Sequence, residues 1–191
     1  MSRTDYNQLA AEIHANSLKH GWWEDKPSAE HFLTLVVCEL AEAVEADRKN
    51  KWAHIPNPIP AGTWCSPQIF HTGNVHFISN FEARIKDTVE DELADAAIRL
   101  LDIAGAYNYD FSKPFAGNYN SMVGIEKSFT ENIGNIMECV LCRTLTTYHR
   151  IACSLVQIKW LAEQLGIDLT WHIRHKMLYN AQRPYKHGKA Y

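Results

Sequence analysis

The amino-acid sequence predicts an all-α fold, a bundle of helices within a single domain that spans residues 1–191. Apolar residues recur at helical spacing over most of the chain, whereas the alternating pattern that is typical of strands is scarce. Helix-ending residues such as Gly21, Gly166 and Pro184 separate these periodic stretches. A chain of 191 residues is also long enough to bury a substantial hydrophobic core.

Two helices are predicted in the first quarter of the chain. The first covers Tyr6 to His20 and ends at Gly21, before the aromatic pair Trp22-Trp23. The second begins after Ser28, whose hydroxyl suits an N-cap, and runs to about Asn50.

The remaining helices are predicted after a long interruption. Residues 52–79 contain prolines and glycines at close intervals, which predicts a long irregular loop. Loops of this length are often lids or binding loops, and an insertion without function is the alternative. A third helix is expected from Ser79, where Ser79 and Glu82 have capping-box spacing, to about Asn108. Further helices are predicted at Ser121–Leu145, Thr147–Leu165 and Leu169–Gln182.

A weak internal similarity is consistent with a duplicated helix pair. Ala104–Phe111, at the end of the third predicted helix, matches Ala162–Leu169, at the end of the fifth. When the two segments are aligned, Arg150–Cys153 coincides with Glu92–Asp95. One interpretation is a degenerate second half over about 118–182 that has lost its acids. The alternative is that two helices end alike by chance.

Composition narrows the classes of function. The formal net charge is −3 with the histidines neutral, so bulk charge favours neither a nucleic acid nor a membrane as partner. The apolar runs are shorter than the ~20 residues that a membrane span needs. Five cysteines, an odd number that lies mostly in apolar helical runs, indicate reduced thiols and a cytoplasmic protein. Cys139 and Cys142 have no partner CxxC motif, so we interpret them as core residues.

Two pairs of acids stand inside unusually apolar helices. Glu39 and Glu42 interrupt the run FLTLVVCELAEAV, and Glu92-Leu-Ala-Asp95 repeats the same spacing. Residues three apart share one helix face, and a buried carboxylate is costly unless it is protonated, paired or bound to metal. Four converging carboxylates therefore predict a site for a hard divalent ion, Mg²⁺ or Mn²⁺ as a substitute. A solvated acidic face is the alternative, whereas a di-iron site is excluded because no Glu is followed three residues later by His.

The last segment of the chain, residues 172–191, is basic in an otherwise mildly acidic protein. Lys176, Asn180 and Arg183 have the spacing of one helical face. A lysine, an amide and a guanidinium on one face suit a polyphosphate that is held against metal ions. A solvated basic C-terminal segment is the alternative, and weak binding of nucleic acid is a further one.

Taken together, these motifs resemble the all-α nucleoside triphosphate pyrophosphohydrolases, the MazG-like superfamily that includes dimeric dUTPase-like and phage-type members. The resemblance is carried by the segments GWWED, LTLVVCELAEAVEADRKNKW, EDELADAAIRLLDIAG and KMLYNAQRPYKHGKAY. It implies a helical bundle of that type and Mg²⁺-dependent hydrolysis of a nucleoside triphosphate between the α- and β-phosphates, which gives a monophosphate and pyrophosphate. It also implies a homodimer or higher homo-oligomer.

The resemblance assigns roles to particular residues. The metal ligands would be Glu39, Glu42, Glu92 and Asp95, with Glu42 as the catalytic base. The phosphate-binding residues would be Lys176, Asn180, Arg183, Tyr185 and Lys186. The nucleobase needs a flat apolar partner, for which Trp22, Trp23 and Trp52 are candidates beside their alternative role in a core or interface. A helical module that senses nucleotides without turnover, or that regulates another protein, is the alternative function.

Overall fold

The structure, a computed structural model, describes residues 5–53, 55, 63, 65, 75–112 and 127–188. Within these ranges the chain forms seven α-helices and no strand, so the prediction of an all-α fold is confirmed. None of the described helices combines the length and the apolar character that crossing a membrane requires. The helices are α1 (Tyr6–Lys19), α2 (Ala29–Arg48), α3 (Val75–Arg84), α4 (Val89–Ala106), α5 (Phe129–Leu141), α6 (Thr147–Gln164) and α7 (Leu169–Asn180), followed by a 3₁₀ turn, η3 (Tyr185–Gly188).

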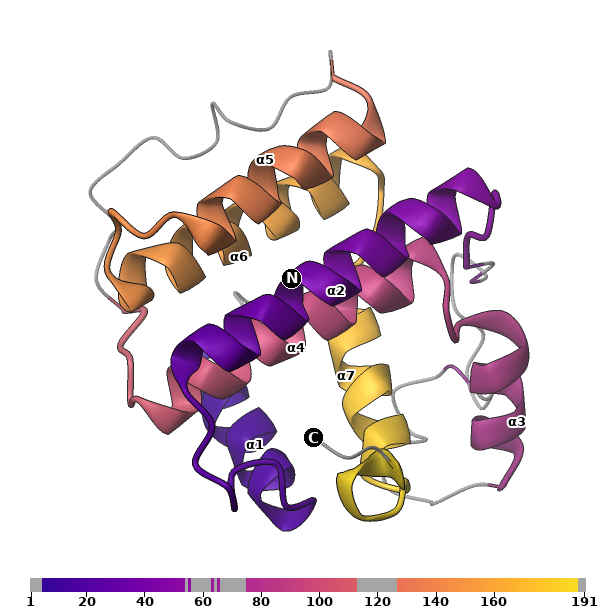
Figure 1. The fold of residues 1–191 in the computed structure, drawn as a ribbon. Coiled ribbons are helices and arrows are strands. Elements are labelled where there is room, and N and C mark those ends of the chain that lie inside the picture. The colour runs from indigo at the N-terminus through magenta and orange to yellow at the C-terminus, as the bar shows by residue number, and fades with distance from the viewer. Residues whose placement is uncertain are drawn as a thin grey trace.

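Helix α4 lies at the centre of the molecule and contacts α1, α2, α6 and α7 (Figure 1). Most of its residues are buried, and these include charged side chains such as Asp91, Glu92 and Asp102 beside the apolar ones. Helices α2 and α4 run antiparallel. The N–H of Val89, at the start of α4, donates to the carbonyl of Lys51, just past the end of α2, at 3.1 Å. Acids from the two helices therefore face each other across one seam.

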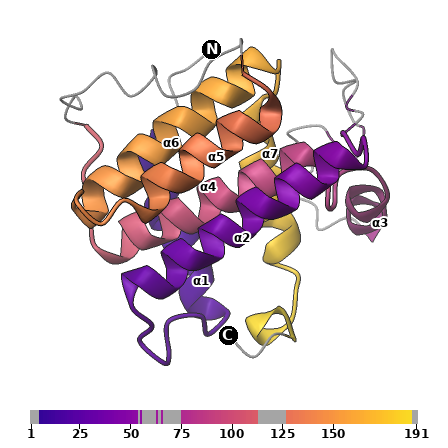
Figure 2. The ribbon, with the colours of Figure 1, turned by 45° about the horizontal axis from the view of Figure 1, so that its top comes forward.

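Helices α5 and α6 form a second pair that packs against α2 and α4 (Figure 2). Leu33 and Leu40 of α2, Leu100 of α4, Ile133 of α5 and Ile158 of α6 belong to one buried core. By contrast, α3 lies apart from this core and packs on α7. Phe77 and Phe81 of α3 and Ile85, just after its end, form a smaller cluster with Tyr179 of α7. The rings of Phe81 and Tyr179 stack with centroids 4.6 Å apart.

The third predicted helix is in fact two helices, α3 and α4. The break falls at Ile85–Thr88, where Asp87 has a left-handed backbone with φ of 58°. The Thr88 hydroxyl then caps α4 by accepting the N–H of Asp91 at 3.3 Å. Helix α3 begins at Val75 rather than at Ser79, so the predicted capping box is wrong and the loop expected over 52–79 ends earlier. The rest of that loop, apart from residues 52, 53, 55, 63 and 65, lies outside the described residues.

The fourth predicted helix starts and ends differently from the prediction of Ser121–Leu145. Helix α5 begins at Phe129, because Ser128 caps it and forms a reciprocal capping box with Glu131. It ends at Leu141, before the N-cap of α6 at Thr146. Residues 121–126 lie outside the described part of the chain.

Arg150, which the internal similarity aligns with Glu92, has a structural role. Its side chain is 3% exposed, its Nε donates to the carbonyl of Val140 at 2.7 Å, and its guanidinium holds both carboxylate oxygens of Glu30. It thereby ties α6 to the end of α5 and to the start of α2. The duplication itself stays a prediction.

Candidate functional site

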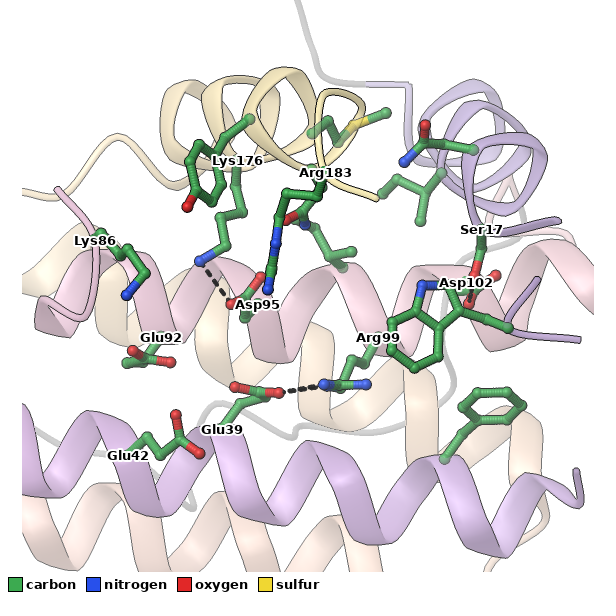
Figure 3. A pocket seen from close by; sticks show the side chains of 18 of the residues that line it. Ser17, Glu39, Glu42, Lys86, Glu92, Asp95, Arg99, Asp102, Lys176 and Arg183 are labelled. Atoms are coloured by element: carbon green, nitrogen blue, oxygen red, sulfur yellow. Dashed lines mark hydrogen bonds and ion pairs between the residues drawn. The ribbon is translucent and has the colours of Figure 1, made fainter. Parts of the chain in front are cut away.

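A cavity of about 260 Å³ lies between α1, α2, α4 and α7, and most of the residues singled out from the sequence line it (Figure 3). Helix α2 contributes Glu39 and Glu42, and α4 contributes Glu92 and Asp95. These acids meet because α2 and α4 pack side by side over most of their length. All four predicted metal ligands therefore face one cavity.

Three of the acids form a tight cluster. Glu39, Glu92 and Asp95 each offer one carboxylate oxygen, and these oxygens lie within 4.8 Å of one another. Glu39 and Glu92 are buried and Asp95 is partly buried. Glu42 lines the same cavity but is exposed and stands outside the cluster of three. It is therefore the acid that solvent reaches most easily.

Two cations already compensate part of this negative charge. The guanidinium of Arg99, one turn after Asp95 on α4, contacts Glu39 Oε1 at 2.5 Å. The Lys176 ammonium, from α7, contacts Asp91 Oδ2 at 2.7 Å and Asp95 Oδ2 at 2.8 Å. Lys176 is only 5% exposed, so this contact also holds α7 against α4.

Arg99 and Lys176 do not fully compensate the negative charge of the acidic cluster, as the pKa values of its carboxyl groups indicate. Burial first, then Asp95 and Asp91, raises the pKa of Glu92 to about 9. Burial also raises the pKa of Glu39, although Arg99 opposes the shift, and raises that of Asp91 to about 7 against the effect of Lys176. The pKa of Lys176 is raised, because Asp95 and Asp91 outweigh the opposing effect of its burial. Carboxyls with pKa values this high lack the positive charge that would stabilise them as anions.

The donor set fits a hard divalent cation. Carboxylate oxygens are the ligands that Mg²⁺ and Mn²⁺ prefer, and three of them converge here without a histidine or cysteine in the cluster. A divalent ion would supply the charge that the raised pKa values show to be missing. Glu39, Glu92 and Asp95 would hold it, and Glu42 lines the same cavity outside this cluster.

The predicted phosphate-binding residues fall into two groups. Lys176, Asn180 and Arg183 line the cavity with the acids. The guanidinium of Arg183 lies 5.8 Å from the ring centroid of Tyr179, and Asn180 Oδ1 is buried without a hydrogen-bond partner among the described residues. An unsatisfied buried acceptor is costly, so a ligand hydroxyl or a water that donates to it would be stabilising.

Tyr185 and Lys186 do not line that cavity. The Tyr185 hydroxyl donates to Glu24, and Lys186 Nζ contacts Asp25 at 2.7 Å, so η3 is held on the turn between α1 and α2. Lys186 instead lines a second cavity of about 540 Å³ beside Trp22 and Phe32. A phosphate role for these two residues stays a prediction.

Of the three tryptophans considered for base stacking, only Trp22 lines the acidic cavity. Trp23 packs on Phe32 with ring centroids 4.4 Å apart, and its Nε1 donates to Asp102 at 3.1 Å. Trp52 packs against the main core, edge-on to Phe129. Trp23 and Trp52 are therefore built into the framework.

Sequence reasoning missed several residues that line or support the cavity. Asp91 anchors Lys176, Arg99 pairs with Glu39, and Asp102 accepts a hydrogen bond from Ser17 Oγ at 2.6 Å. A signal existed for most of them. Asp91, Asp95, Arg99 and Asp102 are spaced by four, four and three residues, which puts them on one face of α4.

Comparisons with protein-family models, with curated proteins and with solved structures gave no match for this chain. The resemblance to the all-α pyrophosphohydrolases therefore rests on the motifs and stays a prediction. What the chain itself provides is an acidic cluster, four cavity-lining cations and three cavity-lining aromatic residues, Trp22, Phe32 and Tyr179, in a single cavity.

Proposed function

We propose that this protein hydrolyses a nucleoside triphosphate between the α- and β-phosphates in the presence of Mg²⁺. One observation carries the proposal: oxygens of Glu39, Glu92 and Asp95 converge within 4.8 Å in a cavity that Arg183 also lines. A cluster of carboxylates suits a metal ion, and a neighbouring guanidinium suits a phosphate. A metal–triphosphate substrate needs both.

The position of each residue in the cavity suggests its role in the proposed reaction. Glu39, Glu92 and Asp95 would bind Mg²⁺, which when bound would supply positive charge against the phosphate oxygens and lower the pKa of water at the site. Arg183, from the turn that follows α7, would neutralise charge that develops on the leaving pyrophosphate. Lys176 would remain on Asp91 and keep a positive charge beside Asp95 when that residue takes part in metal binding.

The hydrolytic step needs a proton acceptor. The oxygen of a water molecule bonds to the α-phosphorus, the bridging bond to the β-phosphate breaks, and the water loses one proton. Glu42 is our candidate for the acceptor, because it faces the cavity, is exposed and, unlike Glu39, forms no ion pair with a cation of the described residues. The products are a nucleoside monophosphate and pyrophosphate.

The test is a screen for pyrophosphate release over canonical and modified triphosphates with Mg²⁺. Glu39→Gln, Glu42→Gln, Glu92→Gln and Asp95→Asn should each lower turnover by about a hundredfold or more, while helicity by circular dichroism is unchanged. Glu45→Gln is the matched control, since Glu45 lies one turn beyond Glu42 on α2, is exposed and pairs with Lys49 and Arg48. Turnover at the wild-type level in all four acid variants would refute the proposal.

A nucleotide sensor without turnover is the second candidate. The pairing of Glu39 with Arg99 at 2.5 Å favours it, because a ligand that a guanidinium already holds is a weaker partner for a metal ion. The same screen separates the two functions. Saturable binding of Mg²⁺ and a triphosphate with no release of pyrophosphate would indicate a sensor.

A further inference from the structure

The four cations that line the acidic cavity differ in how firmly they are held. Arg99 contacts the buried Glu39, and Lys176 contacts the buried Asp91. Both are committed to partners that would be left uncompensated if the cation moved away. Lys86 also lines the cavity, but its carboxylate partner is the adjacent Asp87, at 3.2 Å, whose side chain is 57% exposed. Lys86 can therefore exchange that partner for a ligand at little cost in desolvation, since solvent can take over at Asp87.

The break between α3 and α4 fixes where Lys86 stands. The left-handed backbone of Asp87 turns the chain, its N–H donates to Asp91 Oδ2 at 3.0 Å, and Thr88 caps α4. Asp87, the residue next to Lys86, is thus hydrogen-bonded to the same buried aspartate, Asp91, that anchors Lys176. Figure 3 shows its side chain beside Glu92, on the side of the acids away from Ser17 and Asp102.

The two ends of the cavity, which follow the axis of α4, are lined by different kinds of side chain. Glu92, Asp95, Arg99 and Asp102 follow one another along one face, and ten residues of helix span about 15 Å. The apolar or aromatic side chains of Ile13, Trp22 and Phe32 also line the cavity. They belong to its Asp102 end, because Ser17, one turn after Ile13, and Trp23, which follows Trp22 and packs on Phe32, both donate to Asp102. At the Glu92 end it is lined by Lys86. A ligand with an apolar group at one end and anionic phosphates at the other matches this polarity in one orientation only.

We propose that Lys86 binds the terminal phosphates of the substrate, the part that leaves as pyrophosphate, and that the nucleoside lies toward Trp22. This inference rests on the proposed function, because it assumes that the acids bind a metal–phosphate ligand. It adds a cation from the α3–α4 break to the predicted contacts from α7. The ammonium group would leave Asp87 and contact phosphate oxygens next to Glu92.

The experiment measures ligand binding without turnover, by calorimetric titration of inorganic pyrophosphate in Mg²⁺. Lys86→Ala should weaken binding of pyrophosphate roughly tenfold, the lower end for a charge-assisted contact, and Lys86→Arg should restore most of it. Lys51→Ala is the matched control. Lys51 contacts the same Asp87 carboxylate, at 3.4 Å, and is exposed, but it does not line the cavity. The Lys51→Ala variant should therefore bind pyrophosphate with the affinity of the wild type.

A second titration, of Mg²⁺ alone, separates binding from a structural defect. Lys86→Ala should leave the affinity for Mg²⁺ unchanged, because the acids keep their positions. The inference is overturned if Lys86→Ala binds pyrophosphate normally, if it loses Mg²⁺ affinity to the same extent, or if Lys51→Ala is equally impaired. It is also overturned if the wild type binds no pyrophosphate. Because no turnover is needed, Lys86-dependent binding in a protein that hydrolyses no triphosphate would support this subsite while refuting the proposed activity.

Discussion

Replacing Glu92 by glutamine should stabilise the metal-free protein, and the gain should grow with pH. Burial and the neighbouring Asp95 and Asp91 raise the pKa of Glu92 from 4.5 to about 9. A carboxyl whose pKa is higher in the native state binds its proton more tightly there than in the unfolded chain. Its contribution to stability is therefore fully present below about pH 4.5 and is lost as the pH rises toward 9.

The magnitude follows from linkage. Each pH unit between the two pKa values lowers the free energy of unfolding by about 1.4 kcal/mol, so the loss reaches roughly 3 kcal/mol between pH 4.5 and pH 7. Glutamine has nearly the same shape and no charge to lose. Relative to the wild type, we expect Glu92→Gln to gain up to about 3 kcal/mol at pH 7. In a chain of this size that corresponds to a rise of roughly 6–12 °C in the melting temperature.

The assay is thermal unfolding with a chelator at pH 5, 7 and 8.5, for the wild type, Glu92→Gln and Glu42→Gln. Glu42 lines the same cavity but is exposed, so its variant should show no comparable gain. Added Mg²⁺ should then narrow the difference between wild type and Glu92→Gln, because it stabilises the intact cluster more. A Glu92→Gln variant that is less stable than the wild type at pH 8.5, or a difference that does not vary with pH, would refute the reasoning.

Three further predictions concern the α7 segment and its docking. Lys176→Ala should lower the free energy of unfolding by about 3–5 kcal/mol at pH 8, because it leaves Asp91 buried without its cation. Urea denaturation measures this loss, and a midpoint urea concentration equal to that of the wild type would contradict the prediction. Arg183→Ala should lower kcat/KM for a triphosphate by about ten- to a hundredfold, since the Arg183 guanidinium lines the cavity. The circular dichroism spectrum should be unaltered. Full activity of the variant would mean that Arg183 only packs on Tyr179. Gly21→Ala should cost about 1–2 kcal/mol, because Gly21 has φ of 79° and a Cβ there would lie 2.2 Å from the ring of Tyr185. It should also speed hydrogen exchange at residues 185–188, and protection equal to that of the wild type would contradict the docking of η3.

Much of the fold could be predicted because its signals are local. Ser28 and Thr146 cap α2 and α6, and the apolar periodicity of those helices continues without interruption. The failure at α3 and α4 has a physical reason. Apolar spacing is maintained through Ile85 and Val89, so periodicity alone joins the two helices, while a left-handed Asp87 separates them. Thr88 three residues before Asp91 was the available capping signal.

The candidate site was predictable to the extent that it depends on spacing within one helix. Glu39 and Glu42, or Glu92 and Asp95, share a face whatever surrounds them. The role of Lys176 could not be read in this way. Its helix spacing suggested a phosphate contact, but its ammonium is buried on Asp91 and Asp95, which are more than eighty positions away and meet it only through the packing of α7 on α4.

The contacts that hold η3 on the turn between α1 and α2 have a consequence for the synthesis of the protein. Tyr185 and Glu24 are separated by 161 positions along the chain, as are Lys186 and Asp25. During synthesis the acids of α2 and α4 leave the ribosome well before residues 185–188, whereas a domain generally folds as a unit. Closing so large a loop carries an entropic cost that only the assembled helices can offset. The nascent chain therefore carries the acids of α2 and α4 before Arg183 has been synthesised, and the cavity cannot be complete until the C-terminal segment has emerged.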